Sequence, residues 1–364
     1  MRGSGPLAII AAAVLWGTAG TAGTLALGAG VDADSLDLAA ARLVIGGLVL
    51  GATLIAGARA RLTGLGRSMP LAMVAVLAYQ ICFFAAVDRT GVAIGTVVAI
   101  GSGPVFTGLL SWLFDRTRPS RAWAAATATA IAGCALLLAG GGVDSGRDVT
   151  GGVLIALLGG LLYAFYVVTA ARAINRGAPS GLVMGVMFAG AGVLAIPLLA
   201  VGGVAWLAEP YGLATALYLG CATTALAYVL YGRGLRTTPV ASAATLALAE
   251  PAVAALLGLI VLDERLPALS WAGMALLGLA LVAVARATPA EPADPASGTT
   301  SAATSAAPSG TAADPAAAPA DGTVPETVPE TGAAREAADA AGRVDESGGY
   351  GHPRRDPSTV EGQA

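Results

Sequence analysis

The chain has 364 residues, of which 56% are hydrophobic and only 12% are charged, and its net charge is −3. Soluble domains carry about 25% charged residues, so the composition excludes an ordinary soluble protein and is typical of an integral membrane protein. All twenty basic residues are arginine. Because a Walker A nucleotide site needs a lysine, an ATP-driven pump on this chain is excluded.

Apolar runs of about twenty residues repeat along the first 285 positions. An α-helix needs this length to cross the hydrocarbon core of a bilayer. We interpret the first run as a retained span and not as a cleaved signal peptide. The sequence therefore predicts an all-α integral membrane protein with ten transmembrane helices. The predicted spans are 6–28, 38–57, 69–87, 91–114, 121–141, 150–172, 181–202, 211–232, 238–262 and 267–285.

The arginines alternate between the two sides of these spans, and cytoplasmic loops of membrane proteins are enriched in Lys and Arg. If the N-terminus is cytoplasmic, twelve arginines lie in inner segments and three in outer loops. The sequence thus predicts a multi-pass protein of the plasma membrane with both termini in the cytoplasm. The inner group is Arg2, Arg59, Arg61, Arg67, Arg116, Arg118, Arg121, Arg172, Arg176, Arg233, Arg236 and Arg286, and the outer group is Arg89, Arg147 and Arg265.

A shift of 147 residues brings similar features of the two halves together. Trp16 falls on Tyr163, Thr90 on Thr237, and Pro104 on Pro251. This similarity predicts two five-helix repeats, at 1–145 and 146–286. Five is an odd number, so the second repeat enters the membrane from the opposite side. The turns agree, because DRTRPSR after the fourth span is basic whereas DERLP after the ninth is net acidic.

Residues 287–364 are rich in Ala, Pro, Thr and Glu, and they are expected to form a disordered cytoplasmic tail. The three cysteines, Cys82, Cys134 and Cys221, fall inside apolar runs without metal-binding spacing, so we interpret them as packing residues. The sole histidine, His352, lies in the tail. We therefore expect no metal, no cofactor and no catalytic residue.

Inverted repeats can adopt two similar packings, one open to each side, around a site near the bilayer midplane. Helices interrupted by Gly or Pro at matching positions point to such a site. Here they are GSGP at 101–104 and LAEP at 248–251. We expect Gly103 and Pro104 to act as a hinge in the first repeat.

Several motifs are similar to those of one transporter family. They are VLWG in the first span, Arg42 near the start of the second, TGVAIGTVVAIGSGPVFTGLLSWLF in the fourth, and AEPAVAALLGLIVLDERL followed by WAGMALLGLALV. Over residues 6–285 the chain resembles the EamA-like branch of the drug/metabolite transporter superfamily. The resemblance implies ten spans, an inverted repeat of five helices, and transport of small metabolites without ATP. LFDRTRP departs from the Gly-Glu-Arg type ending that is commoner in the family, which leaves the roles of Asp115 and Arg116 open.

Glu250 is the only acid deep within a predicted span, about twelve residues from either end. An acid at this depth costs about 2.5–3.5 kcal/mol, so Glu250 should face a polar cavity, be protonated or pair with a cation. Pro251 lacks an N–H group and should free the carbonyl of Ala247 to bind a substrate ammonium or a proton-carrying water. Either Glu250 serves proton coupling or substrate binding, or it is a protonated acid that bonds only to local backbone.

Other polar groups within the spans have two interpretations. Arg42 either extends its guanidinium to the nearby interface or contacts a carboxylate or phosphate. The remaining groups either pack between helices or line the cavity. They are Trp16, Tyr79, Gln80, Tyr163, Tyr166, Tyr228 and Tyr231. As the residues that bind substrate or a proton we predict eight: Trp16, Arg42, Gln80, Tyr163, Tyr166, Tyr228, Glu250 and Pro251.

The sequence as a whole favours a secondary active transporter that exports small metabolites, amino acids or drugs by alternating access, with proton coupling through Glu250 as one option. The alternatives are a membrane-embedded enzyme, and a channel or scaffold without active transport. An enzyme is disfavoured because Glu250 has no second deep acid to form a catalytic pair. The expected partners are a small-molecule substrate and the lipid bilayer but no nucleic acid, and a homodimer is compatible with the sequence.

Overall fold

The computed structural model describes residues 4–56, 65–116, 118–141, 146 and 148–287. Within them, ten helical segments are long and apolar enough to cross a membrane, and no strand is found. The predicted all-α membrane fold with ten spans is therefore confirmed. The predicted tail beyond residue 287 lies outside the described residues. Four of the arginines used in the charge analysis also lie outside them, namely Arg2, Arg59, Arg61 and Arg147.

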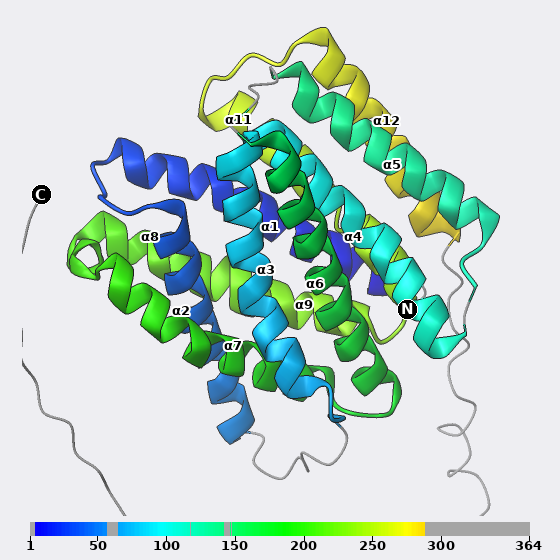
Figure 1. The fold of residues 1–364 in the computed structure, drawn as a ribbon, viewed down its shortest axis with the longest axis horizontal. Helices are drawn as coiled ribbons and strands as arrows, with labels where there is room; N and C mark the ends of the chain where they lie inside the picture. Colours follow the sequence, from blue (N-terminus) through cyan, green and yellow to red (C-terminus); the bar gives the residue numbers. More distant parts are fainter. Residues whose placement is uncertain (1–3, 57–64, 117, 142–145, 147, 288–364) are drawn as a thin grey trace, which may run out of the picture. The chain divides into compact units, whose positions relative to one another are not determined.

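Eight spans are single helices, and two are composite (Figure 1). The eighth span consists of α8 (Pro210–Gly220), a π-helical turn η2 (Cys221–Leu226) and α9 (Ala227–Gly234), and a short 3-10 helix η1 (Ala205–Ala208) precedes it. The ninth span consists of α10 (Val240–Leu246) and α11 (Ala249–Val261). The single helices are α1 (Ser4–Gly28), α2 (Ser35–Ala56), α3 (Met69–Thr90), α4 (Val92–Asp115), α5 (Arg121–Gly140), α6 (Val149–Asn175), α7 (Ser180–Gly202) and α12 (Ala268–Ala287).

Polar residues in the turns define where several helices begin. The Ser120 hydroxyl accepts a hydrogen bond from the backbone N–H of Trp123 at the start of α5. The Asp148 carboxylate does the same for Gly151 at the start of α6. These side chains satisfy N–H groups that have no partner within their own helix, which matters most at a membrane boundary.

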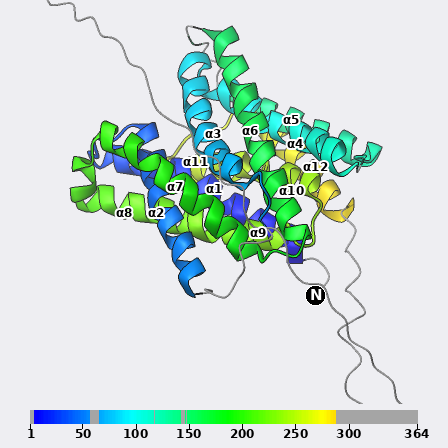
Figure 2. The same cartoon turned by 60° about the horizontal axis from the view of Figure 1, so that its bottom comes forward.

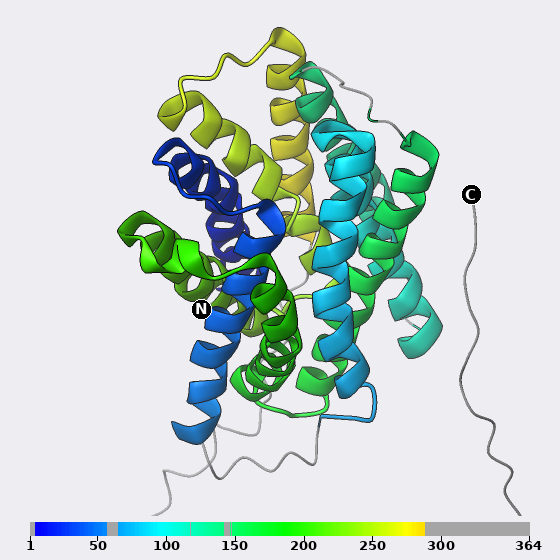
Figure 3. The same ribbon diagram turned by 60° about the vertical axis from the view of Figure 1, so that its left-hand side comes forward.

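The two sequence halves are interlocked and do not form separate bundles. The first helix of each half packs mainly against the other half: α1 against α9 and α11, and α6 against α3 and α4. Figure 2 shows α3 and α6 side by side, and Figure 3 shows the dark blue α1 beside the yellow-green α11. Two further extensive cross-pairs, α2 with α7 and α5 with α12, each join equivalent helices of the two repeats.

The pairing of α5 with α12 shows that the repeats are inverted. The Ser270 hydroxyl near the start of α12 donates a hydrogen bond to the Leu137 carbonyl near the end of α5, at 2.8 Å. The two helices are therefore antiparallel, as Figure 1 shows. It follows that the turn before α5 and the turn before α12 lie at opposite ends of this pair, as the opposite charges of the two turns predict.

Backbone conformation repeats at the predicted 147-residue interval. Arg116 and Asp263, the two non-glycine residues with positive φ in the described chain, have φ of 56° and 53° and follow α4 and α11. Gly30 and Gly177, which follow α1 and α6, have φ of 88° and 95°. Both pairs are separated by 147 positions, so equivalent helices of the two repeats end in the same way.

Contacts between helix ends agree with the alternation of the spans. Arg172 Nε, near the end of α6, forms an ion pair with Asp115 Oδ1, at the end of α4, at 2.9 Å. Both ends belong to the arginine-rich side. The backbone N–H of Asp148 bonds to the Arg89 carbonyl at 3.3 Å, and both residues belong to the opposite side. The open question about Asp115 thus has a structural answer, because this carboxylate links α4 to α6.

The close approach of α5 to α12 depends on glycine, and this generates a prediction about stability. A Cβ atom at Gly133 would lie 2.6 Å from the Leu277 backbone nitrogen and 2.9 Å from the Gly273 carbonyl oxygen. Because backbone atoms cannot move aside, Gly133→Ala should destabilise the fold by about 1–3 kcal/mol and lower its Tm. The measurement is thermal unfolding of the purified protein in detergent.

Gly278→Ala on the same helix pair is the matched control. Gly278 has no atom within 4 Å of its hypothetical Cβ, so this substitution should leave Tm unchanged or raise it slightly. Equal Tm values for the two variants would contradict the proposed packing.

Candidate functional site

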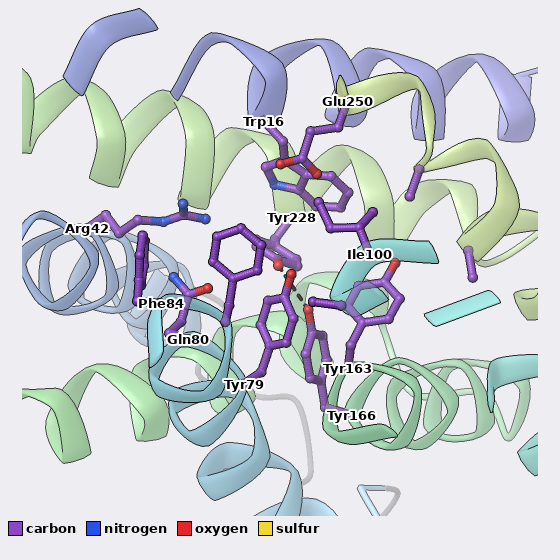
Figure 4. A pocket seen from close by; sticks show the side chains of 14 residues that line it. Trp16, Arg42, Tyr79, Gln80, Phe84, Ile100, Tyr163, Tyr166, Tyr228 and Glu250 are labelled. Atoms are coloured by element: carbon purple, nitrogen blue, oxygen red, sulfur yellow. Dashed lines mark hydrogen bonds between the residues drawn. The ribbon is translucent and has the colours of Figure 1, made fainter. Parts of the chain in front are cut away.

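A small cavity lies where the interlocked helices of the two halves meet (Figure 4). Its volume is about 80 Å³. A water molecule needs about 10–15 Å³ by this kind of measure, and pockets for drug-sized ligands measure about 300–1,000 Å³, so the cavity has room for a few waters in this conformation. Helices α1, α2, α3, α4, α6, α9, α10 and α11 all contribute to it. The lining residues are Trp16, Arg42, Tyr79, Gln80, Phe83, Phe84, Ala99, Ile100, Tyr163, Tyr166, Tyr228, Ala244, Ala247 and Glu250.

Seven of the eight predicted binding residues line this one cavity. They are Trp16, Arg42, Gln80, Tyr163, Tyr166, Tyr228 and Glu250. The eighth, Pro251, is buried in α11 beside Glu250 but is not part of the lining. Their participation in binding stays a prediction, whereas their convergence is a property of the structure.

Two opposite charges face the cavity from different helices. The guanidinium of Arg42 and the carboxylate of Glu250 both point toward its centre (Figure 4). They interact electrostatically, but among the described residues no ion pair joins them. Arg42 therefore does not extend to the membrane interface, which was one of its two predicted roles. The space between the two charges is left for water or a ligand.

Three nitrogen donors beside these charges have no partner in the described structure. They are Arg42 Nε, Gln80 Nε2 and Trp16 Nε1, and all three are buried. A buried donor without a partner costs about 1–3 kcal/mol, so each of these groups is suited to donate a hydrogen bond to a water or a ligand. Gln80 lies next to Arg42, and Trp16 lies next to Glu250 (Figure 4). The lining therefore offers unused donors near both charges.

Tyrosine rings of α6 and α9 form the wall of the cavity opposite Glu250. The hydroxyls of Tyr166 and Tyr228 lie 3.2 Å apart, and those of Tyr163 and Tyr231 lie 3.3 Å apart. Trp16 packs its ring on Tyr228 at a centroid distance of 5.1 Å. The tyrosine pairs join α6 to α9 within the second half, and the Trp16–Tyr228 contact joins this pair to α1 of the first half.

The helix that carries Glu250 is interrupted beside the cavity, but not in the predicted way. The ninth span breaks at residues 247–248, and the Ala247 carbonyl accepts a hydrogen bond from the N–H of Glu250 at 3.0 Å. The expectation that Pro251 frees this carbonyl was therefore wrong, because a tighter turn at the start of α11 uses it. Glu250 then lies in the first turn of α11, where the helix dipole stabilises negative charge.

The matching interruption expected in the first repeat is absent. Helix α4 continues through Gly103 and Pro104 without a break. A Cβ at Gly103 would lie 3.0 Å from Tyr163 Cδ1, so this glycine provides room for a cavity side chain. The role of Gly103 and Pro104 as a hinge stays a prediction.

The cavity is sealed more tightly toward the arginine-rich side. The largest buried cluster takes most of its members from the halves of the helices that face this side, including Ile9 of α1, Val167 of α6, Leu235 after α9 and Leu246 of α10. From Ala243 to Ala249 every residue of the ninth span is buried, whereas from Ala252 to Val261 only Gly258 is. The structure is thus packed more closely between the cavity and the arginine-rich side.

Several lining residues were not among the predicted binding residues. Tyr79, Phe83 and Phe84 of α3 and Ile100 of α4 complete the aromatic and apolar part of the wall. The spacing of Tyr79 and Phe83 by four positions places them on one helix face, and their ring centroids are 6.2 Å apart. Tyr79 was already a candidate for packing or for cavity lining, and its four-residue spacing from Phe83 was the available signal for Phe83. Among the described residues, no group of three or more His, Cys, Asp or Glu side chains is suited to a metal ion.

Comparisons with known proteins agree with the architecture. The model of the EamA-like transporter family matches residues 3–139 and again residues 150–286. A Bacillus subtilis (strain 168) protein described as the uncharacterized transporter YwfM is 38% identical over 286 residues, which cover 77% of this chain and 93% of that protein. A protein of known crystal structure, 20% identical, superposes with a TM-score of 0.64 over 78% of this chain and 96% of its own, which supports the fold alone.

Proposed function

The chain belongs to the EamA-like transporter family, and we propose that it is a secondary active transporter of small zwitterionic metabolites that exchanges them for protons. That it is a multi-pass membrane transporter follows from its family and its ten apolar helices. The substrate class, the coupling and the direction are our proposal. The observation that carries it is the presence of Arg42 and Glu250, unpaired with each other, on one small cavity between inverted repeats.

The substrate class follows from the chemistry of the lining. Arg42 and Gln80 supply donors for a carboxylate, and Glu250 supplies an acceptor for an ammonium group. The Trp16 ring beside Glu250 adds a face that attracts a cation. A ligand with both groups would neutralise both buried charges at once, which a purely cationic or anionic ligand cannot do. The small cavity favours amino-acid-sized ligands over drug-sized ones.

Proton coupling follows from competition for one carboxylate. When Glu250 is ionised it binds the substrate ammonium, and when it takes up a proton it releases that group. Access to the cavity alternates between the two sides as the halves change their packing. In the conformation described, the closer packing on the arginine-rich side supports access from the opposite side. The positive-inside rule supports a plasma-membrane protein with cytoplasmic termini and this access toward the exterior.

The proposed direction is export. A proton that enters from the exterior would displace the substrate there, and the carboxyl group would lose the proton to the cytoplasm before it binds the next substrate. An enzyme is disfavoured because the lining contains no acid other than Glu250 and no histidine. A fixed channel is disfavoured because the cavity is closed more tightly on one side than on the other.

Substitution of Glu250 tests the coupling. Glu250→Gln keeps the shape of the side chain but cannot exchange a proton, so substrate-driven proton movement should be lost and the residual flux should not depend on pH. Proteoliposomes that contain a pH-sensitive dye and a mixture of neutral amino acids provide the measurement. Glu209→Gln, an exposed acid before α8, is the control and should behave as the wild type. Coupling that survives in Glu250→Gln would refute the proposed proton site.

Substitution of Arg42 tests the substrate class. We expect Arg42→Gln to weaken binding of a neutral α-amino acid about ten- to hundred-fold, because a hydrogen bond to a charged group contributes about 1.5–3 kcal/mol. Binding of the corresponding amino acid amide, which lacks the carboxylate, should change little. The measurement is competition by both ligands against amino acid uptake, with the exposed Arg89→Gln as control. An equal loss for both ligands would contradict the assignment of Arg42 to a carboxylate.

A further inference from the structure

A second hollow lies on the outer surface of α4 and α5, away from the central cavity. Its volume is about 560 Å³. Its walls are apolar side chains of both helices, among them Val105, Leu109 and Trp112 of α4 and Trp123 and Ile131 of α5. Val105, Leu109 and Trp112 are themselves exposed at the surface of the chain. The hollow is therefore an apolar groove that runs along two membrane-spanning helices.

One end of this groove is positively charged. Arg118, in the turn between α4 and α5, is part of the lining, and Arg116 and Arg121 are exposed in the same turn. Thr127 also lines the groove, but its hydroxyl is 2.9 Å from that of Thr245 and is thus engaged inside the protein. The groove therefore combines an apolar trough at the depth of the hydrocarbon with cationic groups at the level of the helix ends.

From this arrangement we propose that the α4–α5 groove is a binding site for an anionic phospholipid. One acyl chain lies in the trough between Val105 and Trp123, and the phosphate contacts Arg118. The lipid belongs to the leaflet on the arginine-rich side, which is the cytoplasmic leaflet under the proposed orientation. Arginine is suited to this role because its guanidinium binds phosphate oxygens through paired hydrogen bonds.

The equivalent turn of the other repeat differs in charge. The turn between α11 and α12 contains Asp263 and Glu264 with a single arginine, Arg265. Acidic groups at this position would repel an anionic headgroup. The charge complementarity that supports a lipid at α4 and α5 is therefore a property of one repeat, although the two repeats share their backbone architecture.

A second copy of the chain fits the groove less well than a lipid does. A two-fold dimer places the same surface patch of each copy against the other. Two concave grooves would then face each other and leave a void, and the arginine clusters would approach one another. A flexible acyl chain fills a concave trough without either cost.

Fluorescence quenching by brominated lipids tests this proposal directly. The test uses the full chain with Trp123 as the only tryptophan, the other four being replaced by phenylalanine. This protein is reconstituted in two sets of phosphatidylcholine vesicles. One set contains brominated phosphatidylglycerol, and the other contains the same mole fraction of brominated phosphatidylcholine. Arginine near a membrane surface supports about a five-fold preference for an anionic lipid. We expect this preference in the quenching of Trp123, and we expect Arg118→Gln to remove it.

Trp271 provides the matched control within the same molecule. It is exposed on α12, next to the acidic turn of the other repeat. A variant with Trp271 as its only tryptophan should be quenched equally by both brominated lipids. A preference of similar size at Trp271 would show a general attraction to the bilayer and would overturn the proposal.

Two further results would also contradict the lipid site. One is a Trp123 preference that survives in Arg118→Gln. The other is quenching of Trp123 that decreases as the protein-to-lipid ratio rises, which would place a second copy in the groove. If the single-tryptophan variants do not fold, native mass spectrometry of the wild type and Arg118→Gln compares the retention of phosphatidylglycerol and phosphatidylcholine. Equal retention of the two lipids by the wild type would likewise overturn the proposal.

Discussion

A carboxylate in the middle of an apolar span is the constraint on which the rest of this structure depends. Glu250 requires water, a proton or a cation, because hydrocarbon supplies none of the hydrogen bonds that an ionised acid needs. The fold meets this requirement with a cavity to which eight helices contribute. Arg42 supplies the opposite charge across the cavity, without direct contact. A site with two separated charges is poised for a ligand that carries both.

Inversion of the repeats explains how such a site can serve transport. Equivalent helix ends have the same backbone conformation, as Arg116 and Asp263 show, so the two halves have similar packing options. The site itself breaks this symmetry. At the 147-residue interval, Glu250 corresponds to Gly103 and Arg42 to Ala189. The scaffold is therefore nearly symmetric, which favours alternating access, whereas the chemistry is assigned to single positions.

The sequence predicts the spans and the repeat interval because apolar length and turn residues are local properties. Glu250 was identifiable for the same reason, as the only acid deep in a span. The rotation of each helix was not predictable, because a face against lipid and a face against another helix are both apolar. The sequence therefore names Arg42 and Glu250 as binding residues, but it could not decide whether Arg42 faces the cavity or the membrane interface. Nor could the sequence show that the helix breaks at residues 247–248 but continues through Pro104, since tertiary packing decides how each proline is accommodated.

The central claim is that one water-filled cavity is accessible from each side of the membrane in turn. The direct test places a single cysteine at Ile100, which lines the cavity, in a chain whose Cys82, Cys134 and Cys221 are replaced by alanine. An impermeant thiol reagent is applied from either side of oriented vesicles, at several pH values and with and without amino acids. We expect the labelling rates from the two sides to change in opposite directions when these conditions change. Rates that rise and fall together, or labelling that never occurs from one side, would contradict the central claim.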